Sequence, residues 1–123
     1  MRKLLSTILI PLLILISLAG CSKVDDATLF AAHKAVENGA VIIDVRTVKE
    51  YNHQHIDDAI NIPIEELTKS LARVPRDKII VVYCKSGSRS SGAARILTKA
   101  GWKVYDVATQ SEYNRKVEAP LKN

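Results

Sequence analysis

Apolar and polar residues follow one another along the chain in blocks that differ in length and spacing. Residues 40–45 form a nearly continuous apolar run bounded by glycine and polar residues, which is typical of a strand buried on both faces of a sheet. Three more short runs predict strands over 59–62, 79–83 and 104–107. Apolar spacing and helix-favouring composition predict helical segments over 26–38, 48–51, 65–71, 88–100 and 112–117.

The predicted strands and helices alternate, and the connections between them are short. Asp25 or Asp26 can cap the first helix, Asn38-Gly39 is a stop signal for it, and Gly101 ends the helix that begins at Ser88. Such alternation predicts an α/β fold in which a small parallel β-sheet is flanked by helices on both faces. Functional sites of such sheets lie beyond the carboxyl ends of the strands.

The first 20 residues have a different pattern. Arg2 and Lys3 precede an apolar stretch from Leu4 to Leu18, and small residues follow, as in a secretory signal peptide. The apolar stretch is shorter than the roughly 20 residues of a membrane-spanning helix, and a retained membrane anchor is the alternative. The segment 18–21, Leu-Ala-Gly-Cys, resembles the lipobox of bacterial lipoproteins, which implies cleavage before Cys21 and attachment of lipid to its sulfur.

On this interpretation the chain has three parts. Residues 1–20 are a lipoprotein signal peptide, 21–27 are a lipidated N-terminus and tether, and 28–123 form one domain. We expect the protein to be exported and held at a membrane by its lipid, facing the periplasm or the cell exterior. Its formal charge of +5 includes Arg2 and Lys3, and the other basic residues are scattered. We therefore expect no nucleic-acid partner, and we expect a monomer.

Cys84 is the residue most clearly suited to act as a reactive group. With Cys21 assigned to lipid, it has no partner for an internal disulfide. It stands where a predicted strand meets a predicted helix, so backbone N–H groups and the helix N-terminus can favour its thiolate. Gly87 lets the backbone turn, and Arg89 can bind an oxyanion through two hydrogen bonds. The alternative is a buried, unreactive cysteine in an ordinary turn.

Four motifs in order resemble those of rhodanese (thiosulfate sulfurtransferase) domains. The segment 84–89, Cys-Lys-Ser-Gly-Ser-Arg, followed by a helix, resembles the active-site loop of the family. Residues 42–51 resemble a strand leading into D-V-R-x-x-x-E-[YF], and residues 55–63 resemble H-I-P-G-A-x-N-I-P. Together with the Ala-Gly-Trp turn at 100–102, the resemblance covers residues 41–107 and implies the three-layer rhodanese-like fold.

The resemblance also implies a mechanism and roles for individual residues. Cys84 would be the catalytic nucleophile, which takes sulfur from a small anionic donor such as thiosulfate and carries it as a persulfide. A thiol, or cyanide in an assay, would accept that sulfur. The residues expected to bind the donor are Lys85, Ser86, Gly87, Ser88, Arg89 and Arg46. We expect no cofactor and no metal, because the three histidines are not accompanied by a further thiol. Asp44, Arg46 and Glu50 are expected to be mainly structural, and lining the pocket is the alternative role for Arg46.

Two other functions remain open at this stage. Cysteine phosphatases and arsenate reductases of related fold have five residues between cysteine and arginine, whereas this chain has four, and Tyr83 replaces their usual histidine. A rhodanese fold can also act without catalysis, as a binding module or a sulfur carrier or sensor. The presence of Cys84 favours the enzyme over that module.

Gln54 replaces the family's usual glycine before histidine, and two longer segments also depart from the family pattern. Asp57-Asp58 replaces Pro-Gly, so that turn must be built differently. The segment 108–110, Ala-Thr-Gln, replaces a common Gly-Gly pair near the rim of the pocket. The second departure concerns the preference for donor and acceptor more than the chemistry of the cysteine.

Overall fold

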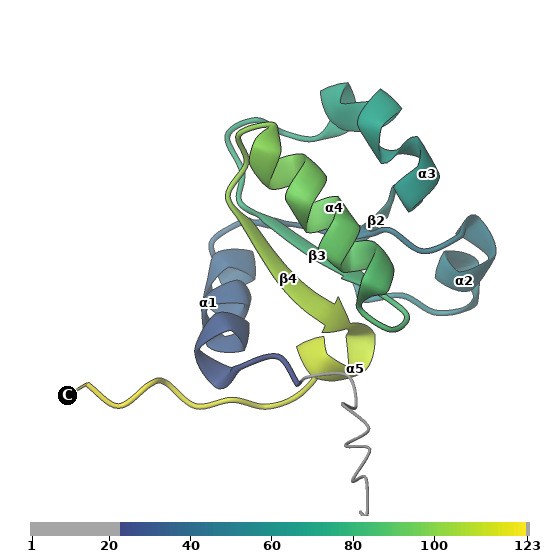
Figure 1. Ribbon diagram of the computed structural model, residues 1–123. Coiled ribbons are helices and arrows are strands. Elements are labelled where there is room, and N and C mark those ends of the chain that lie inside the picture. The colour runs from purple at the N-terminus through teal and green to yellow at the C-terminus, as the bar shows by residue number, and fades with distance from the viewer. Residues whose placement is uncertain (1–22, 123) are drawn as a thin grey trace, which may run out of the picture.

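The computed structural model of the chain describes residues 23–122 (Figure 1). The predicted signal peptide and the predicted lipid attachment at Cys21 lie outside these residues. Four parallel strands form one sheet in the order β2-β1-β3-β4. Their bounds are Val41–Asp44 for β1, Ile60–Asn61 for β2, Ile80–Cys84 for β3 and Val104–Thr109 for β4. Among residues 23–122, no helix has the length and apolar character needed to cross a membrane.

Helices cover both faces of this sheet, so the predicted three-layer α/β fold is confirmed (Figure 1). Helices α1 (Asp26–Glu37), α2 (Val48–His53) and α5 (Gln110–Tyr113) contribute to the apolar cluster on one face. The other cluster includes α3 (Ile64–Leu67), the 3-10 helix η1 (Thr68–Arg73) and α4 (Ser88–Lys99). Asp25 caps α1 by accepting a hydrogen bond from the Thr28 N–H, one of the two caps that the sequence allowed.

Strand β3 lies between β1 and β4, and all five of its residues are buried. Because side chains alternate along a strand, Ile80, Val82 and Cys84 face the cluster that contains α4. Val81 and Tyr83 face the cluster that contains α1. This alternation places Cys84 at the carboxyl end of the sheet on the side of α4.

Two predicted helices differ from those observed. The last helix spans 110–113 and not 112–117, because the Thr109 side chain accepts a hydrogen bond from the Glu112 N–H at 3.0 Å and begins the helix earlier. The helix predicted over 65–71 is a short α-helix that continues as a 3-10 helix to Arg73. The two helix types share similar short-range apolar spacing, so the sequence pattern did not separate them.

Both longer departures from the family pattern contain a position of positive φ. Asp58 has a φ of 63° in a turn closed by a hydrogen bond from the Ala59 N–H to the Ile56 carbonyl. Ala108 has a φ of 60° at a bulge, where the pairing of β3 with β4 shifts by one residue before Thr109. Glycine adopts this conformation without steric cost, so the glycines of the family pattern suit the same two turns.

We expect the substitution Ala108→Gly to increase the free energy of unfolding. The left-handed conformation costs a residue with a Cβ about 1–2 kcal/mol, and the greater freedom of glycine in the unfolded chain offsets about 0.4–1 kcal/mol of that gain. Urea unfolding should therefore show a net gain below about 1.5 kcal/mol. The control is Ala35→Gly in α1, which should lower stability by about 1 kcal/mol. Equal losses at both positions would contradict the strain assigned to Ala108.

Candidate active site

The Cys84 sulfur lies at the N-terminus of helix α4. Cys84 is 1% exposed, and its Sγ accepts hydrogen bonds from the Gly87 N–H at 3.0 Å and the Ser90 N–H at 3.3 Å. Gly87 has a φ of 93°, and a Cβ at this position would lie 3.3 Å from the Cβ of Ala108. The positive φ favours glycine here, and a Cβ would also make a tight contact with β4. The loop aims N–H groups at the sulfur, an arrangement that favours an anion there.

Opposing effects act on the pKa of the Cys84 thiol. Burial raises the pKa, because it removes water from the charged form. Hydrogen bonds from the hydroxyl and N–H of Ser90, and from the N–H groups of Ser86 and Gly87, lower it. The hydrogen bonds outweigh burial, so the pKa of Cys84 lies below its ordinary value. The hydroxyl of Ser90 can also donate to the Gly87 carbonyl at 3.1 Å, so it can turn between the backbone and the sulfur.

We expect alkylation of Cys84 by iodoacetamide to accelerate with rising pH and to reach a plateau. The thiolate is the reactive form, so the midpoint should lie below that of an unperturbed cysteine. Ser90→Ala removes one donor to the thiolate and should move the midpoint to higher pH. Ser88→Ala is the control, because Ser88 is exposed and is not among the donors to Sγ. A midpoint at or above that of a free cysteine would contradict the lowered pKa.

Arg89 forms an ion pair with Glu50 of α2. Its Nη2 lies 3.0 Å from Oε2 of Glu50, and its Nη1 lies 3.3 Å from Oε1. Both side chains are partly exposed. The pair connects the Cys84 loop to α2 and balances the positive charge that the sequence suggested for donor binding. The expected role of Glu50 as a structural residue agrees with this contact, and the role of Arg89 toward a donor stays a prediction.

Arg46 belongs to a second ion pair at the end of β1. Asp44 is fully buried, and its Oδ2 accepts hydrogen bonds from Arg46 Nη2 at 2.7 Å and from the Tyr83 hydroxyl at 2.8 Å. Burial raises the pKa of Tyr83 to about 12, which keeps its hydroxyl a neutral donor. Arg46 also donates to the Gln54 carbonyl. These contacts connect β1, β3 and the end of α2. They agree with the structural role expected of Arg46, and its role in donor binding stays a prediction.

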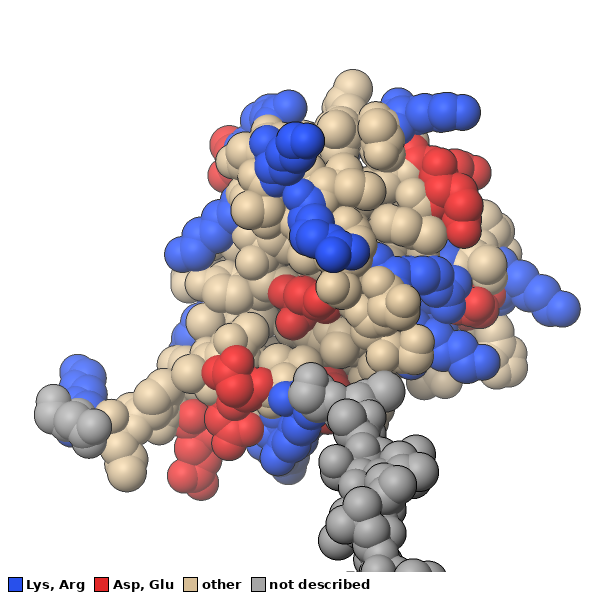
Figure 2. Space-filling model, viewed as in Figure 1, with Lys and Arg blue, Asp and Glu red and all other residues tan. Residues whose placement is uncertain are grey.

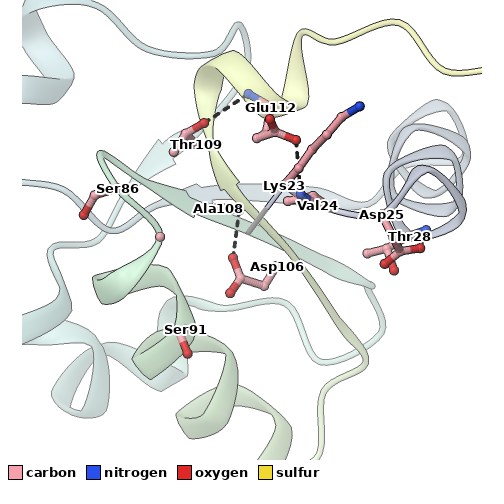
Figure 3. A pocket seen from close by; sticks show the side chains of 11 residues that line it. Lys23, Val24, Asp25, Thr28, Ser86, Ser91, Asp106, Ala108, Thr109 and Glu112 are labelled. Atoms are coloured by element: carbon pink, nitrogen blue, oxygen red, sulfur yellow. Dashed lines mark hydrogen bonds between the residues drawn. The ribbon is translucent and has the colours of Figure 1, made fainter. Parts of the chain in front are cut away.

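A cleft of about 590 Å³ borders the Cys84 loop (Figure 3). Ser86 and Gly87 of the loop line it, together with Ser91 of α4. The remaining lining residues are Lys23, Val24, Asp25, Thr28, Asp106, Ala108, Thr109 and Glu112. Three segments that are far apart in the sequence therefore meet beside the loop: the segment before α1, the first turn of α4 and the end of β4 with α5.

The sequence had indicated the loop but not most of this cleft. Lys85, Ser86 and Ser88 are exposed at the rim of the loop, close to the sulfur along the chain. Asp106 and Glu112 were not singled out, because a single carboxylate in a polar segment carries no distinctive pattern. The sequence pointed to Thr109 only because it belongs to the segment 108–110, which replaces the Gly-Gly pair of the family.

Two of the histidines, His33 and His55, make local contacts. The His55 ring stacks on Tyr51 with 3.8 Å between ring centroids, and its Nδ1 lies 2.8 Å from the Tyr51 carbonyl oxygen. The His33 Nε2 lies 2.6 Å from the Tyr113 carbonyl oxygen. Over residues 23–122, no three or more His, Cys, Asp or Glu side chains are grouped so that they could hold a metal ion.

Comparison with known proteins places this loop in a family. The model of the rhodanese-like domain matches residues 28–112, which include the Cys84 loop. The chain belongs to the rhodanese-like domain family. The resemblance found in the sequence motifs is therefore confirmed.

Curated rhodanese-like relatives include proteins named as sulfurtransferases. Thiosulfate sulfurtransferase PspE of Escherichia coli is 39% identical over 62 residues, which are 49% of this chain and 60% of that protein. Thiosulfate sulfurtransferase GlpE of Pseudomonas savastanoi is 35% identical over 72 residues, or 58% of this chain and 68% of that protein. The chain thus spans only about 60% of the length of the E. coli relative.

Solved rhodanese structures share the fold. A rhodanese-related protein from Thermoplasma volcanium has a TM-score of 0.61 at 31% identity, covering 81% of this chain and 98% of that chain. A structure described as a rhodanese with anions from E. coli has a TM-score of 0.58 at 30% identity, covering 63% of this chain and 95% of that chain. The match covers nearly the whole of each of these two solved chains.

Proposed function

We propose that this rhodanese-like domain is a sulfurtransferase that moves sulfane sulfur from thiosulfate, or a similar anionic donor, to a thiol acceptor through a persulfide on Cys84. The observation that carries the proposal is the buried Cys84 Sγ, which accepts two backbone hydrogen bonds at the N-terminus of α4. The relatives named thiosulfate sulfurtransferases suggest the donor.

The first half-reaction uses the features that lower the pKa of Cys84. The Cys84 thiolate attacks the outer sulfur of thiosulfate, an S–S bond forms, and the S–S bond of the donor breaks. Its electron pair leaves with sulfite, so the transferred sulfur remains on Cys84 as a persulfide. The N–H groups of Gly87 and Ser90 stabilise the thiolate before this step, and the exposed Lys85 attracts the anionic donor.

The second half-reaction returns Cys84 to its starting state. An acceptor thiolate attacks the outer sulfur of the persulfide, and the electron pair of the broken S–S bond returns to Cys84 as thiolate. Cyanide reacts in the same way and leaves as thiocyanate. The loop N–H groups then stabilise the Cys84 thiolate as the leaving group.

The proposal is tested by intact mass spectrometry of the protein before and after thiosulfate, and again after cyanide. We expect Cys84 to gain the mass of one sulfur atom, and cyanide to remove it. Cys84→Ser should show no gain. If neither thiosulfate, mercaptopyruvate nor polysulfide adds sulfur, catalysis is contradicted and the non-catalytic binding or carrier module is favoured.

We expect Glu50→Gln to lower the KM for thiosulfate. The change keeps the size of the side chain but removes the negative charge that faces Arg89, so more positive charge remains beside the loop. A partly exposed pair is worth about 0.2–1 kcal/mol, which corresponds to a KM lower by up to about fivefold. Glu65→Gln on α3 is the control for the loss of one exposed charge. A higher KM would show that Glu50 is needed mainly to shape the loop.

We further propose that the protein is a lipoprotein, cleaved before Cys21 and held at a membrane by lipid on that residue. The basic start, the apolar stretch and the Leu-Ala-Gly-Cys segment support this. Labelled palmitate should be incorporated when the chain is produced in a bacterium, and Cys21→Ala should abolish incorporation. Labelling that persists in Cys21→Ala would place the lipid elsewhere.

A further inference from the structure

The segment that leads into α1 is held against the catalytic end of the domain. The Val24 N–H donates to Oε2 of Glu112 at 3.2 Å, and Nη2 of Arg115 donates to the Val24 carbonyl at 2.5 Å. Arg115 also pairs with Asp26 and Glu112. Because Glu112 belongs to α5, which follows directly after β4, these contacts fix Val24 at the carboxyl end of the sheet (Figure 1).

The same segment forms one wall of the cleft beside Cys84. Lys23, Val24 and Asp25 line the cleft, and Ser86 and Gly87 line it from the loop (Figure 3). The Gly87 N–H is one of the donors to the Cys84 sulfur. The described residues therefore begin beside the Cys84 loop and not at the opposite end of the sheet.

Position 21 lies only two residues before Lys23. Two residues of extended chain span at most about 7 Å, so an attachment at Cys21 cannot hold Lys23 far from the lipid headgroups. Because Lys23 lines the cleft, the cleft stays close to the membrane surface whatever the tilt of the domain. The turn at Asp77, just before β3 begins, lies at the other end of the sheet. Acidic and basic side chains are interspersed on the face seen in Figure 2.

We propose that the cleft beside Cys84 faces the lipid surface of the membrane, and that donor and acceptor reach the sulfur through the gap between domain and headgroups. This inference rests on the proposed sulfur transfer and lipid attachment. It adds a partner surface to the site and makes the composition of the membrane part of the environment of the reaction.

The membrane surface then controls access of an anionic donor. The negative surface potential of an anionic membrane lowers the concentration of a dianion at the surface by about tenfold, and the effect decays over about 8 Å at physiological salt. Thiosulfate should therefore load Cys84 more slowly on anionic membranes than on neutral ones. An uncharged or membrane-borne acceptor is not subject to this exclusion.

The orientation is tested on the full lipidated chain, reconstituted into phosphatidylcholine vesicles that contain a headgroup spin label. Two reporters are made in the Cys84→Ser background, Ser111→Cys on α5 and Asp77→Cys at the turn before β3, and each is labelled with a fluorophore. Ser111 and Asp77 are both exposed, so they form a matched pair. We expect the spin label to quench the reporter at 111 at least threefold more strongly than the reporter at 77.

Each other outcome of this measurement overturns the inference. Equal quenching, or stronger quenching at 77, means that the cleft does not face the lipid. Protection of the reporter at 111 from both the spin label and aqueous iodide means that a protein, such as a second copy of the chain, covers the cleft. Failure of the full chain to bind vesicles removes the attachment on which the orientation depends.

The functional consequence is tested by the rate at which thiosulfate loads Cys84 of the full chain on vesicles. On vesicles rich in phosphatidylserine we expect loading to be about two- to tenfold slower than on phosphatidylcholine, and high salt should remove the difference. Equal rates on both lipids would overturn the inference and leave the sulfur transfer intact. Absence of loading on every vesicle and in detergent would instead contradict the proposed function.

Discussion

Replacing Cys84 by serine is expected to reduce the formation of thiocyanate from thiosulfate and cyanide by at least about 1,000-fold, as is typical when a covalent nucleophile is removed. A serine hydroxyl can accept the same hydrogen bonds from Gly87 and Ser90, but it cannot form a persulfide. The loss should therefore be in kcat and not only in KM. Initial rates measured over a range of both substrates test this expectation.

The matched control for this variant is Ser91→Ala, which removes a hydroxyl from the wall of the cleft and leaves Cys84 in place. Its turnover should stay within a few-fold of that of the native chain. Urea unfolding should show that Cys84→Ser keeps the fold, since only one buried atom changes and its partners remain. A folded Cys84→Ser protein that still turns over would exclude the persulfide mechanism.

Replacing Asp44 by alanine is expected to destabilise the fold by about 3–5 kcal/mol, the usual cost of removing one partner of a buried ion pair. Asp44 is fully buried and accepts hydrogen bonds from Arg46 and from the Tyr83 hydroxyl. Without the carboxylate, a mostly buried guanidinium loses its charged partner and a buried hydroxyl loses its acceptor. The free energy of unfolding in urea measures the effect.

Two further variants test whether the loss of stability in Asp44→Ala comes from the buried network and not from the removal of any carboxylate. Asp57→Ala removes an exposed carboxylate and should change stability by less than about 0.5 kcal/mol. Asp44→Asn keeps one acceptor oxygen and should lose less stability than Asp44→Ala. If Asp44→Ala costs no more than Asp57→Ala, the network at the end of β1 does not stabilise the fold in the way that its geometry indicates.

Much of the fold could be predicted from the sequence because its signals are local. A buried parallel strand needs a run of apolar residues, and the run at 79–83 correctly located β3 to within one residue at each end. Asp25 could cap α1 because the cap is made with Thr28, three residues away. The position of Cys84 at the end of β3, before the loop that leads into α4, followed from the same local signals. So did the orientation of loop N–H groups toward its sulfur.

The contacts that shape the rest of the site are not local. Arg89 meets Glu50 across 39 residues, and Arg115 meets Val24 across 91. A charged residue in a polar segment has the same local signature whether it faces water, a donor or another side chain. For this reason the sequence suggested an anion-binding Arg89, while only the structure paired it with a carboxylate.

The chain by itself thus determined the order of strands and helices, the family, and the place of the one described cysteine, because apolar periodicity and backbone chirality act over a few residues. Tertiary structure decided the partner of Arg89, the bulge at Ala108 and the position of Val24 beside the cleft. Each of these depends on which distant side chains come together once the sheet has formed. That choice is made by packing and by the cost of leaving buried polar groups without partners.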